Sequence, residues 1–158
     1  VAALADISID TTGLAPADLR RQLLISLEIE SNSPIPVKLL SFSYRHGVPE
    51  SADIVLDMRF AQNPHWAEGL RMQTGMDDDI VSFLKADEAV QTVIKHFKAM
   101  LTPMLARMSA EGRAQISIAF GCTGGRHRSV WAAEHIRQWL IENGHQASII
   151  HRELHAHS

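Results

Sequence analysis

The sequence has very little cysteine, few aromatic residues and no long hydrophobic run. One cysteine among 158 residues cannot form an internal disulfide, and this is typical of a reducing compartment, so we expect a cytoplasmic protein. No apolar stretch approaches the roughly 20 residues that span a bilayer, and the first residues lack the basic region of a signal peptide, so no membrane partner is expected. A net charge of -3 excludes a strong overall basic field for nucleic acid.

The overall composition is that of an ordinary globular protein. Hydrophobic residues make up 46% and charged residues 21% of the chain, which is long enough to bury a sizeable core. The first residue is Val1 rather than Met, so we expect this chain to be part of a longer protein.

Two parts are expected along the chain, separated by a linker. Residues 4–10 alternate as a short strand, and a helix is expected from Pro16, with leucines at helical spacing. Residues 31–36, "SNSPIP", have the composition of a linker. We therefore expect a strand and helix within residues 1–30, a linker at 31–36 and the main domain at 37–158.

The main domain alternates apolar, β-prone runs with amphipathic helices. Strands are expected at residues 37–44, 53–58, 114–120 and 145–154. Helices are expected at 77–112, as one helix kinked by Pro103, and at 127–144. Residues 59–76 lack clear periodicity and predict a long ordered loop. This order predicts an α/β fold with a mostly parallel sheet flanked by helices, and ligands at the carboxyl ends of its strands.

The stretch "GCTGGRHRSV", residues 121–130, lies between an expected strand and an expected helix. Gly124 and Gly125 let backbone amides approach a ligand closely. The first turn of the following helix adds unpaired N–H groups and the positive end of the helix dipole. The backbone here therefore favours an anion.

The side chains of the same stretch point to a phosphate. The guanidinium groups of Arg126 and Arg128 match phosphate oxygens in a bidentate way, and His127 and Ser129 can donate further hydrogen bonds. The alternative is a glycine-rich turn whose arginines are only solvated.

A second alternative is catalytic. The spacing from Cys122 to Arg128 is that of the Cys-x5-Arg-Ser/Thr loop of cysteine-dependent phosphatases, in which a thiolate attacks phosphorus and an aspartic acid protonates the leaving group. Asp57 or the acidic run 77–79 could supply the acid. Against this interpretation, the phosphatase pattern usually has His before the Cys, and Gly121 stands there.

Three separated motifs resemble a known family. The stretches "FSYRHGVPESADIVLDMRFAQNPHW", "LRMQTGMDDDI" and "IAFGCTGGRHRSV" are similar, in order, to the C-terminal domain of the RNase adaptor protein RapZ family. The resemblance implies a phosphofructokinase-like architecture that binds glucosamine-6-phosphate, contacts regulatory proteins and small RNA, and assembles into homo-oligomers. It also implies that residues 1–30 are the remaining strand and helix of the family's N-terminal P-loop NTPase domain and that residues 37–158 are its phosphosugar-binding C-terminal domain. The nucleotide-binding P-loop itself is absent from this chain, so we expect a regulatory domain, with no catalytic activity and no cofactor.

The motif matches propose the ligand contacts. Together with the residues argued from the loop itself, the predicted set is Cys122, Thr123, Gly124, Gly125, Arg126, His127, Arg128, Ser129, His46, Arg59, Asn63, His65 and Thr74.

Some candidates carry a second interpretation. His46 could serve only as a local hydrogen-bonding residue, and Asp57 could anchor loop amides rather than act as an acid. Three histidines, at 151, 155 and 157, lack the surrounding ligands of a metal site, and no metal is expected. RapZ ends in a basic cluster used for RNA, but Arg152 is the only fixed positive charge after residue 145 here, so RNA is retained only as a candidate partner.

Overall fold

The computed structural model describes residues 7–27 and 34–154, which contain one four-stranded parallel sheet. The strands are β1 (Val37–Ser43), β2 (Ile54–Asp57), β3 (Ile116–Cys122) and β4 (Ala147–His151), in the spatial order β2-β3-β1-β4. Every strand pair is parallel. The predicted α/β fold with a parallel sheet is confirmed.

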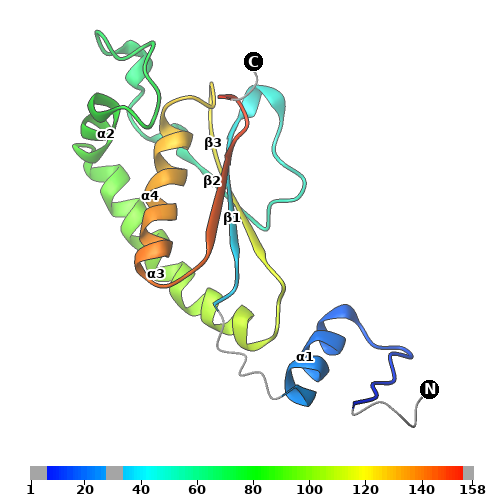
Figure 1. Cartoon of the computed structure of the whole chain (residues 1–158). Coiled ribbons are helices and arrows are strands. Elements are labelled where there is room, and N and C mark those ends of the chain that lie inside the picture. The colour runs from blue at the N-terminus through cyan, green and yellow to red at the C-terminus, as the bar shows by residue number, and fades with distance from the viewer. Residues whose placement is uncertain (1–6, 28–33, 155–158) are drawn as a thin grey trace.

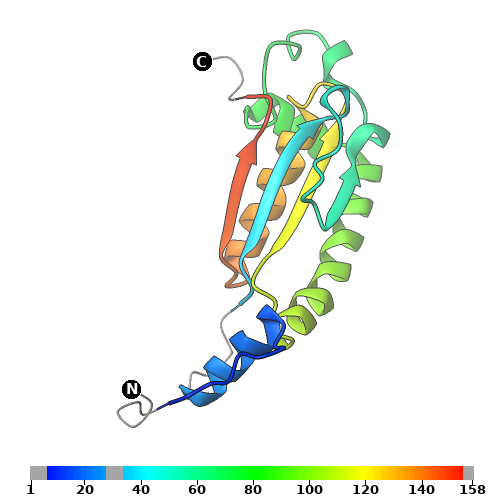
Figure 2. The ribbon, with the colours of Figure 1, turned by 90° about the vertical axis from the view of Figure 1, so that its right-hand side faces the viewer.

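The helices α2 (Asp78–Lys85), α3 (Glu88–Ala110) and α4 (Arg128–Glu142) lie on one face of this sheet (Figures 1 and 2). Helix α4 packs against β1, β3 and β4, and α3 reaches the same face, where the ring of Phe97 meets the edge of Phe120. The helix α1 (Pro16–Ser26) lies apart from the sheet in both views. The core of the protein therefore lies between β1, β3 and the two long helices.

The sequence of each strand explains its place in the sheet. β3 has the sequence "ISIAFGC" and is buried along its whole length, as suits an inner strand with a hydrogen-bonded neighbour on each side. β4 alternates between half-buried and exposed residues until His151, which is typical of an edge strand with one covered face. β3 extends two residues beyond the predicted end at Phe120, so Cys122 is the last residue of the strand.

The prediction of one helix over residues 77–112 is wrong, because the structure has two helices there. The carboxylate of Asp87 accepts hydrogen bonds from the backbone N–H groups of Ala89 and Val90, which caps a new helix at Glu88. Its second oxygen accepts the backbone N–H of Gln62, so the break also fixes the long loop. Pro103 lies inside α3, which continues past it to Ala110.

The predicted strand at residues 4–10 is not observed. Residues 7–10 have no regular structure, and residues 4–6 lie outside the described part of the chain. The helix expected from Pro16 is present as α1. Of the expected linker 31–36, residues 34–36 have no regular structure and the others lie outside the described residues.

The strand register determines what meets at the carboxyl edge of the sheet. Ser43 at the end of β1 pairs with Cys122, and Asp57 at the end of β2 pairs with Gly121. The segments that follow these three strands therefore start side by side, although 79 positions separate Ser43 from Cys122 in the sequence.

Candidate functional site

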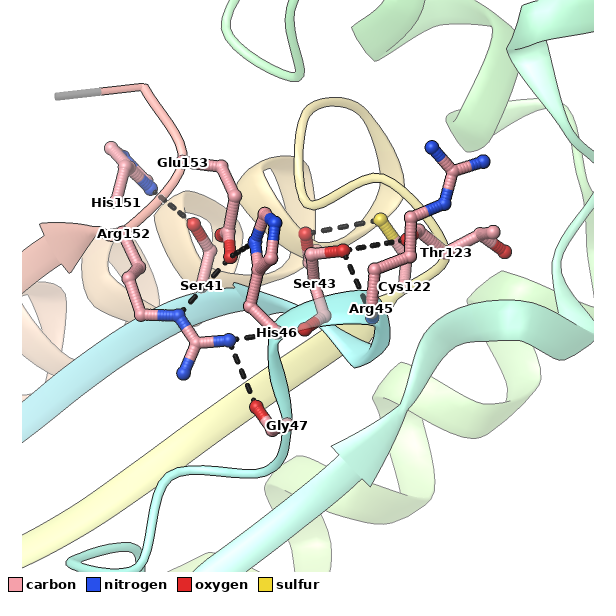
Figure 3. A network of polar contacts seen from close by, with 11 residues as sticks. Ser41, Ser43, Arg45, His46, Gly47, Cys122, Thr123, His151, Arg152 and Glu153 are labelled. Carbon is pink, nitrogen blue, oxygen red and sulfur yellow. Dashed lines mark hydrogen bonds and ion pairs between the residues drawn. The ribbon is translucent and has the colours of Figure 1, made fainter. Parts of the chain in front are cut away.

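The loop between β3 and α4 forms the centre of the site. β3 ends at Cys122 and α4 begins at Arg128, so five residues make the whole connection. The hydroxyl of Ser43 donates a hydrogen bond to the carbonyl of Thr123 (2.6 Å), which ties the loop to the end of β1 (Figure 3). The buried Cys122 Sγ lies 3.2 Å from Ser129 Oγ, which joins the last residue of β3 to the first turn of α4.

Glycine is required at one point of this loop. Gly125 has φ +68°, in the left-handed region, and a Cβ there would collide with the carboxylate of Glu153. Glu153 is itself held by His46 Nδ1 and Arg152 Nε, which contact its Oε1 at 3.2 and 3.1 Å. The turn after β4 thus packs against the back of the loop.

Arg128 is buried and held by the backbone of the neighbouring segment. Its side chain donates to the carbonyls of Arg59 (3.2 Å) and Ala61 (3.0 Å) and to Thr123 Oγ1 (3.4 Å), and the residue is only 5% exposed. These bonds hold the guanidinium in one orientation and attach the segment after β2 to the loop.

Arg126 likewise donates hydrogen bonds to backbone carbonyls, here at the end of the long loop 59–76. Its Nε donates to the carbonyl of Gln73 (2.9 Å) and its Nη2 to the carbonyl of Met72 (2.6 Å). In return, the backbone N–H of Gly75 donates to the carbonyl of Arg126 (2.9 Å). The residues before α2 are therefore docked on the loop by reciprocal hydrogen bonds.

His127 is buried and has a lowered pKa. Burial is the main cause, the positive charge of Arg126 and the ring of His65 add to it, and backbone contacts with Gln73 and Arg71 oppose it. The imidazole is therefore neutral at neutral pH. Its Nε2 has no hydrogen-bond partner among the described residues.

These segments enclose a cavity of about 420 Å³, a size typical of small-molecule sites. Its lining residues are Arg45, Asn63, His65, Trp66, Arg71, Met72, Cys122, Thr123, Gly124, Arg126, His127 and Arg128. Of the predicted contacts, the structure brings together Asn63, His65 and, from the loop, Cys122, Thr123, Gly124, Arg126, His127 and Arg128.

Other predicted contacts lie outside the lining of the cavity. His46 bonds Glu153 and is largely exposed, and Thr74 donates its hydroxyl to the carboxylate of Asp77 (2.8 Å). The Gly125 and Ser129 positions lie behind the lining, against Glu153 and Cys122 respectively.

Arg59 and Asp57 form an ion pair beside the cavity rather than in its wall. Arg59 Nη2 lies 2.6 Å from Asp57 Oδ2, and the guanidinium stacks over the ring of Tyr44 at 3.8 Å. The Asp57 carboxylate also accepts the backbone N–H of Arg59, so it anchors the turn after β2. The hydrogen bond from the Arg59 side chain is the main cause that lowers the pKa of Asp57.

Several residues that line the cavity are absent from the predicted set: Arg45, Trp66, Arg71 and Met72. Each adjoins or lies within a motif already noted, "YRHG", "NPHW" or "LRMQTG". These residues could have been predicted from the sequence, because the motifs carry arginines and an aromatic residue in loops that follow strands, where ligand-binding residues concentrate.

The fold and the cavity define an α/β domain with an arginine-lined cavity at the carboxyl end of a parallel sheet. A family described as the RapZ C-terminal domain matches residues 35–155. The chain belongs to this family.

Full-length relatives agree with this assignment. The chain is 43% identical to a nucleotide-binding protein of Paramagnetospirillum magneticum, covering 95% of this chain and 49% of the relative. It is 40% identical to one of Rhodospirillum centenum (95% and 45%) and 37% identical to one of Fervidobacterium nodosum (96% and 54%). The chain spans about half the length of the curated relatives it matches.

Two general properties of the structure bear on its class. Along the described residues, no helix combines the length and apolar character needed to cross a bilayer. Within the same residues, no group of three or more His, Cys, Asp and Glu side chains is arranged to hold a metal ion. His151 instead contacts Ser41 Oγ (2.8 Å) and Glu134 Oε1 (3.1 Å), and positions 155 and 157 lie outside the described residues.

Proposed function

We propose that this domain senses a phosphorylated amino sugar, glucosamine-6-phosphate, and relays its presence to regulatory proteins. The observation that carries the proposal is the cavity of about 420 Å³ at the carboxyl end of β3, which the loop residues Thr123 and Gly124 line together with Arg126 and Arg128. Fixed guanidinium groups and a helix N-terminus favour a phosphate, and the identity of the sugar rests on the resemblance to the family.

Calorimetry tests this proposal. Glucosamine-6-phosphate should bind saturably, and Arg128→Lys, which keeps the charge but loses the planar fork, should weaken binding by about tenfold or more. Arg107→Lys is the matched control, because Arg107 lies on α3 and pairs with Glu111 on the surface. Equal binding by both variants would show that the loop is not the site.

A second variant separates binding from stability. Arg128 holds the carbonyls of Arg59 and Ala61, so its loss also disturbs the fold. Thr123→Val removes one exposed hydroxyl at the cavity wall, whose only contact with Arg128 is a long hydrogen bond of 3.4 Å, and should weaken binding with a smaller change in melting temperature than Arg128→Lys. Unchanged affinity in Thr123→Val and in Arg128→Lys together would contradict the proposal.

A cysteine-dependent phosphatase is the second candidate, favoured by one contact. Cys122 lines the cavity and its Sγ lies 3.2 Å from Ser129 Oγ, a hydroxyl that could stabilise a thiolate. The proposed acid is less suitable, because a lowered pKa keeps Asp57 ionised and it cannot then donate a proton to a leaving group. Release of p-nitrophenol from p-nitrophenyl phosphate, lost in Cys122→Ser, would establish this activity; glucosamine-6-phosphate that binds without release of phosphate would exclude it for that ligand.

Small RNA and self-assembly are further parts of the proposal. Arg152, the fixed charge near the C-terminus, is used within the fold, since its Nη2 donates to the carbonyls of Ser43 and Gly47. This weakens the case for an RNA contact there. A gel shift whose affinity falls steeply with salt would support RNA binding, and sedimentation would show whether a homo-oligomer forms.

A further inference from the structure

The four lysines of this chain differ in their surroundings. Lys85 and Lys95 are exposed on α2 and α3, and Lys38 is half-buried in β1. Lys98 on α3 is also half-buried. Within the described residues it is the lysine whose ammonium group contacts another side chain at hydrogen-bond distance.

The partner of Lys98 is His135 on the neighbouring helix α4. Lys98 Nζ lies 2.9 Å from His135 Nε2. Burial, with the nearby charges of Lys98 and Lys85, lowers the pKa of His135 to about 4, so this imidazole is neutral at neutral pH. The ammonium group therefore donates to an unprotonated Nε2. His135 accepts this hydrogen bond but supplies no negative charge to Lys98.

No carboxylate offsets the burial of Lys98 at close range. Burial is the main cause that lowers the pKa of Lys98, and the charge of Glu142 opposes it. Glu142 forms no ion pair with Lys98 among the described residues, and its Oε1 accepts a hydrogen bond from Gln138 instead (2.9 Å). The ring of Trp139 is also distant, with its centre 5.9 Å from Lys98 Nζ. The ammonium form of Lys98 is therefore poorly stabilised.

These surroundings favour the free amine, which is the nucleophilic form of lysine. An exposed lysine holds very little free amine at neutral pH, because water stabilises the ammonium form. Lys98 is half-buried rather than buried, so a small electrophile reaches its amine. The positive charges of Lys98 and Lys85, which both act on His135, favour an electrophile that carries negative charge.

We propose that Lys98 is an acylation site of this domain and that the acyl donor is a small acyl phosphate, such as acetyl phosphate. The ammonium group first gives one proton to water. The free amine then attacks the carbonyl carbon of the donor, and a C–N bond forms as the bond from that carbon to the phosphate oxygen breaks. The second proton leaves the nitrogen with the phosphate as hydrogen phosphate, and the product is a neutral amide.

Acylation changes the contact between α3 and α4. The amide carries no positive charge, so His135 loses one of the charges that lower its pKa, and the pKa of His135 should rise. Lys98 is not among the residues that line the cavity at the carboxyl end of β3. The inference therefore does not rest on the proposed phosphosugar function, and either can fail without the other.

Site-resolved mass spectrometry tests the inference on the folded chain after brief exposure to acetyl phosphate. The remaining amines are capped with isotopically labelled acetic anhydride after unfolding, which gives the occupancy of every lysine. At about pH 7.5, Lys98 should be acetylated about fivefold or more faster than Lys95. Lys95 is the matched control because it lies on the preceding turn of α3 and is exposed. Lys38, the half-buried control, should also react more slowly than Lys98.

A pH series separates protonation from access. As the pH rises to about 10.5, every lysine gains free amine, so the ratio of the Lys98 rate to the Lys95 rate should fall toward one. A ratio that stays constant over the series would mean that the two lysines differ only in access, and it would overturn the inference. This series uses the unaltered chain, so it needs no variant that could disturb the fold.

Two variants of His135 test the role of its neutral ring. His135→Glu places a carboxylate beside Lys98, which should raise the pKa of Lys98 and bring the ratio at about pH 7.5 close to one. His135→Gln keeps a neutral acceptor and should retain most of the ratio. In the unaltered chain, an NMR titration should show a higher pKa of His135 after acetylation. Equal rates at Lys98 and Lys95, a ratio that survives His135→Glu, or an unchanged His135 pKa would each overturn the inference.

Discussion

The two ends of the same four strands are built differently. At the carboxyl end, a Cβ on Gly75, Gly121 or Gly125 would collide with backbone atoms of the loop and α4, with aromatic rings, or with Glu153. At the amino end, Gly112 and Gly144 have nothing within 4 Å of the same added atom, and only their positive φ angles call for glycine.

The difference shows where close packing serves the cavity. Gly75 at the carboxyl end lets the residues before α2 approach the backbone at the start of α4, and Gly121 and Gly125 leave room for the side chains of aromatic residues and of Glu153, whereas Gly124 has open space. Glycine at the amino end only lets the chain turn. The carboxyl end is therefore closely packed at Gly75, Gly121 and Gly125, and such packing favours a preorganised site.

The largest loss of stability is expected when Gly75 is substituted. An added methyl group would overlap the carbonyl of His127 and the backbone nitrogen of Trp131, so Gly75→Ala should lower the free energy of unfolding by about 3 kcal/mol. Urea denaturation measures this. Gly124→Ala is the control, because that position has open space and no positive φ, and it should be close to wild type. A stable Gly75→Ala variant would mean that the two segments are not in contact.

We expect acid to lower the stability of the protein through His135, which lies in α4 between the two ends of the sheet. Burial, with the nearby charge of Lys98, lowers the pKa of His135 to about 4, from an unfolded value of 6.5. As pH falls from 6.5 toward 4, the unfolded chain takes up a proton that the folded protein does not, so stability decreases, by about 2 kcal/mol after screening of a partly exposed ring.

Denaturation between pH 7 and 4.5 checks this effect in the variant His135→Gln. Its loss of stability in acid should be smaller than that of wild type, although not zero, because burial also lowers the pKa of His127 and His145. An identical pH dependence in the variant would refute the assignment to His135.

A moderate effect is expected where β1 and β4 join at the carboxyl end. Ser41 Oγ and His151 Nδ1 are 2.8 Å apart in the core, so Ser41→Ala leaves a buried ring nitrogen without its partner and should cost about 1.5 kcal/mol. Ser148→Ala, on the exposed half of β4, should change little. Thermal melts measure the loss of stability in both variants. Equal losses would show that the two ends of β4 do not differ in this respect.

The smallest effect is expected at the amino end. Gly144→Ala meets no neighbouring atom, and the cost of its φ of +81° should be about 1 kcal/mol. Gly144→Asn should recover part of this loss, because asparagine tolerates the left-handed region. If Gly144→Ala were as damaging as Gly75→Ala in the same urea series, steric contact would not be what separates the two ends.

Much of the fold follows from local pattern. The four apolar runs of the main domain became β1 to β4, and the stretch between β3 and α4 could be recognised because strand, glycines and helix start are contiguous in the sequence. The division between α2 and α3 was missed because the apolar periodicity continues across Asp87. What breaks the helix there is the hydrogen bonding of one carboxylate, including a bond to Gln62 from another segment.

The composition of the cavity wall was less predictable. His46 and Arg59 were named from their motifs, but in the structure each has a carboxylate partner, Glu153 and Asp57. Arg45 and Arg71 were not predicted to line the cavity, because nothing in the neighbouring sequence shows that they have no carboxylate partner. Whether an arginine is paired depends on which acidic residues the fold brings within reach.

The sequence by itself determined a parallel α/β sheet and an anion-favouring loop after its third strand, because hydrophobic periodicity, glycine and helix N-termini act over a few residues. Only the tertiary structure decided which charges would remain unpaired around that loop. The reason is physical: backbone conformation is governed by neighbours along the chain, whereas charge pairing depends on distances of a few ångströms between side chains that the sheet register brings together.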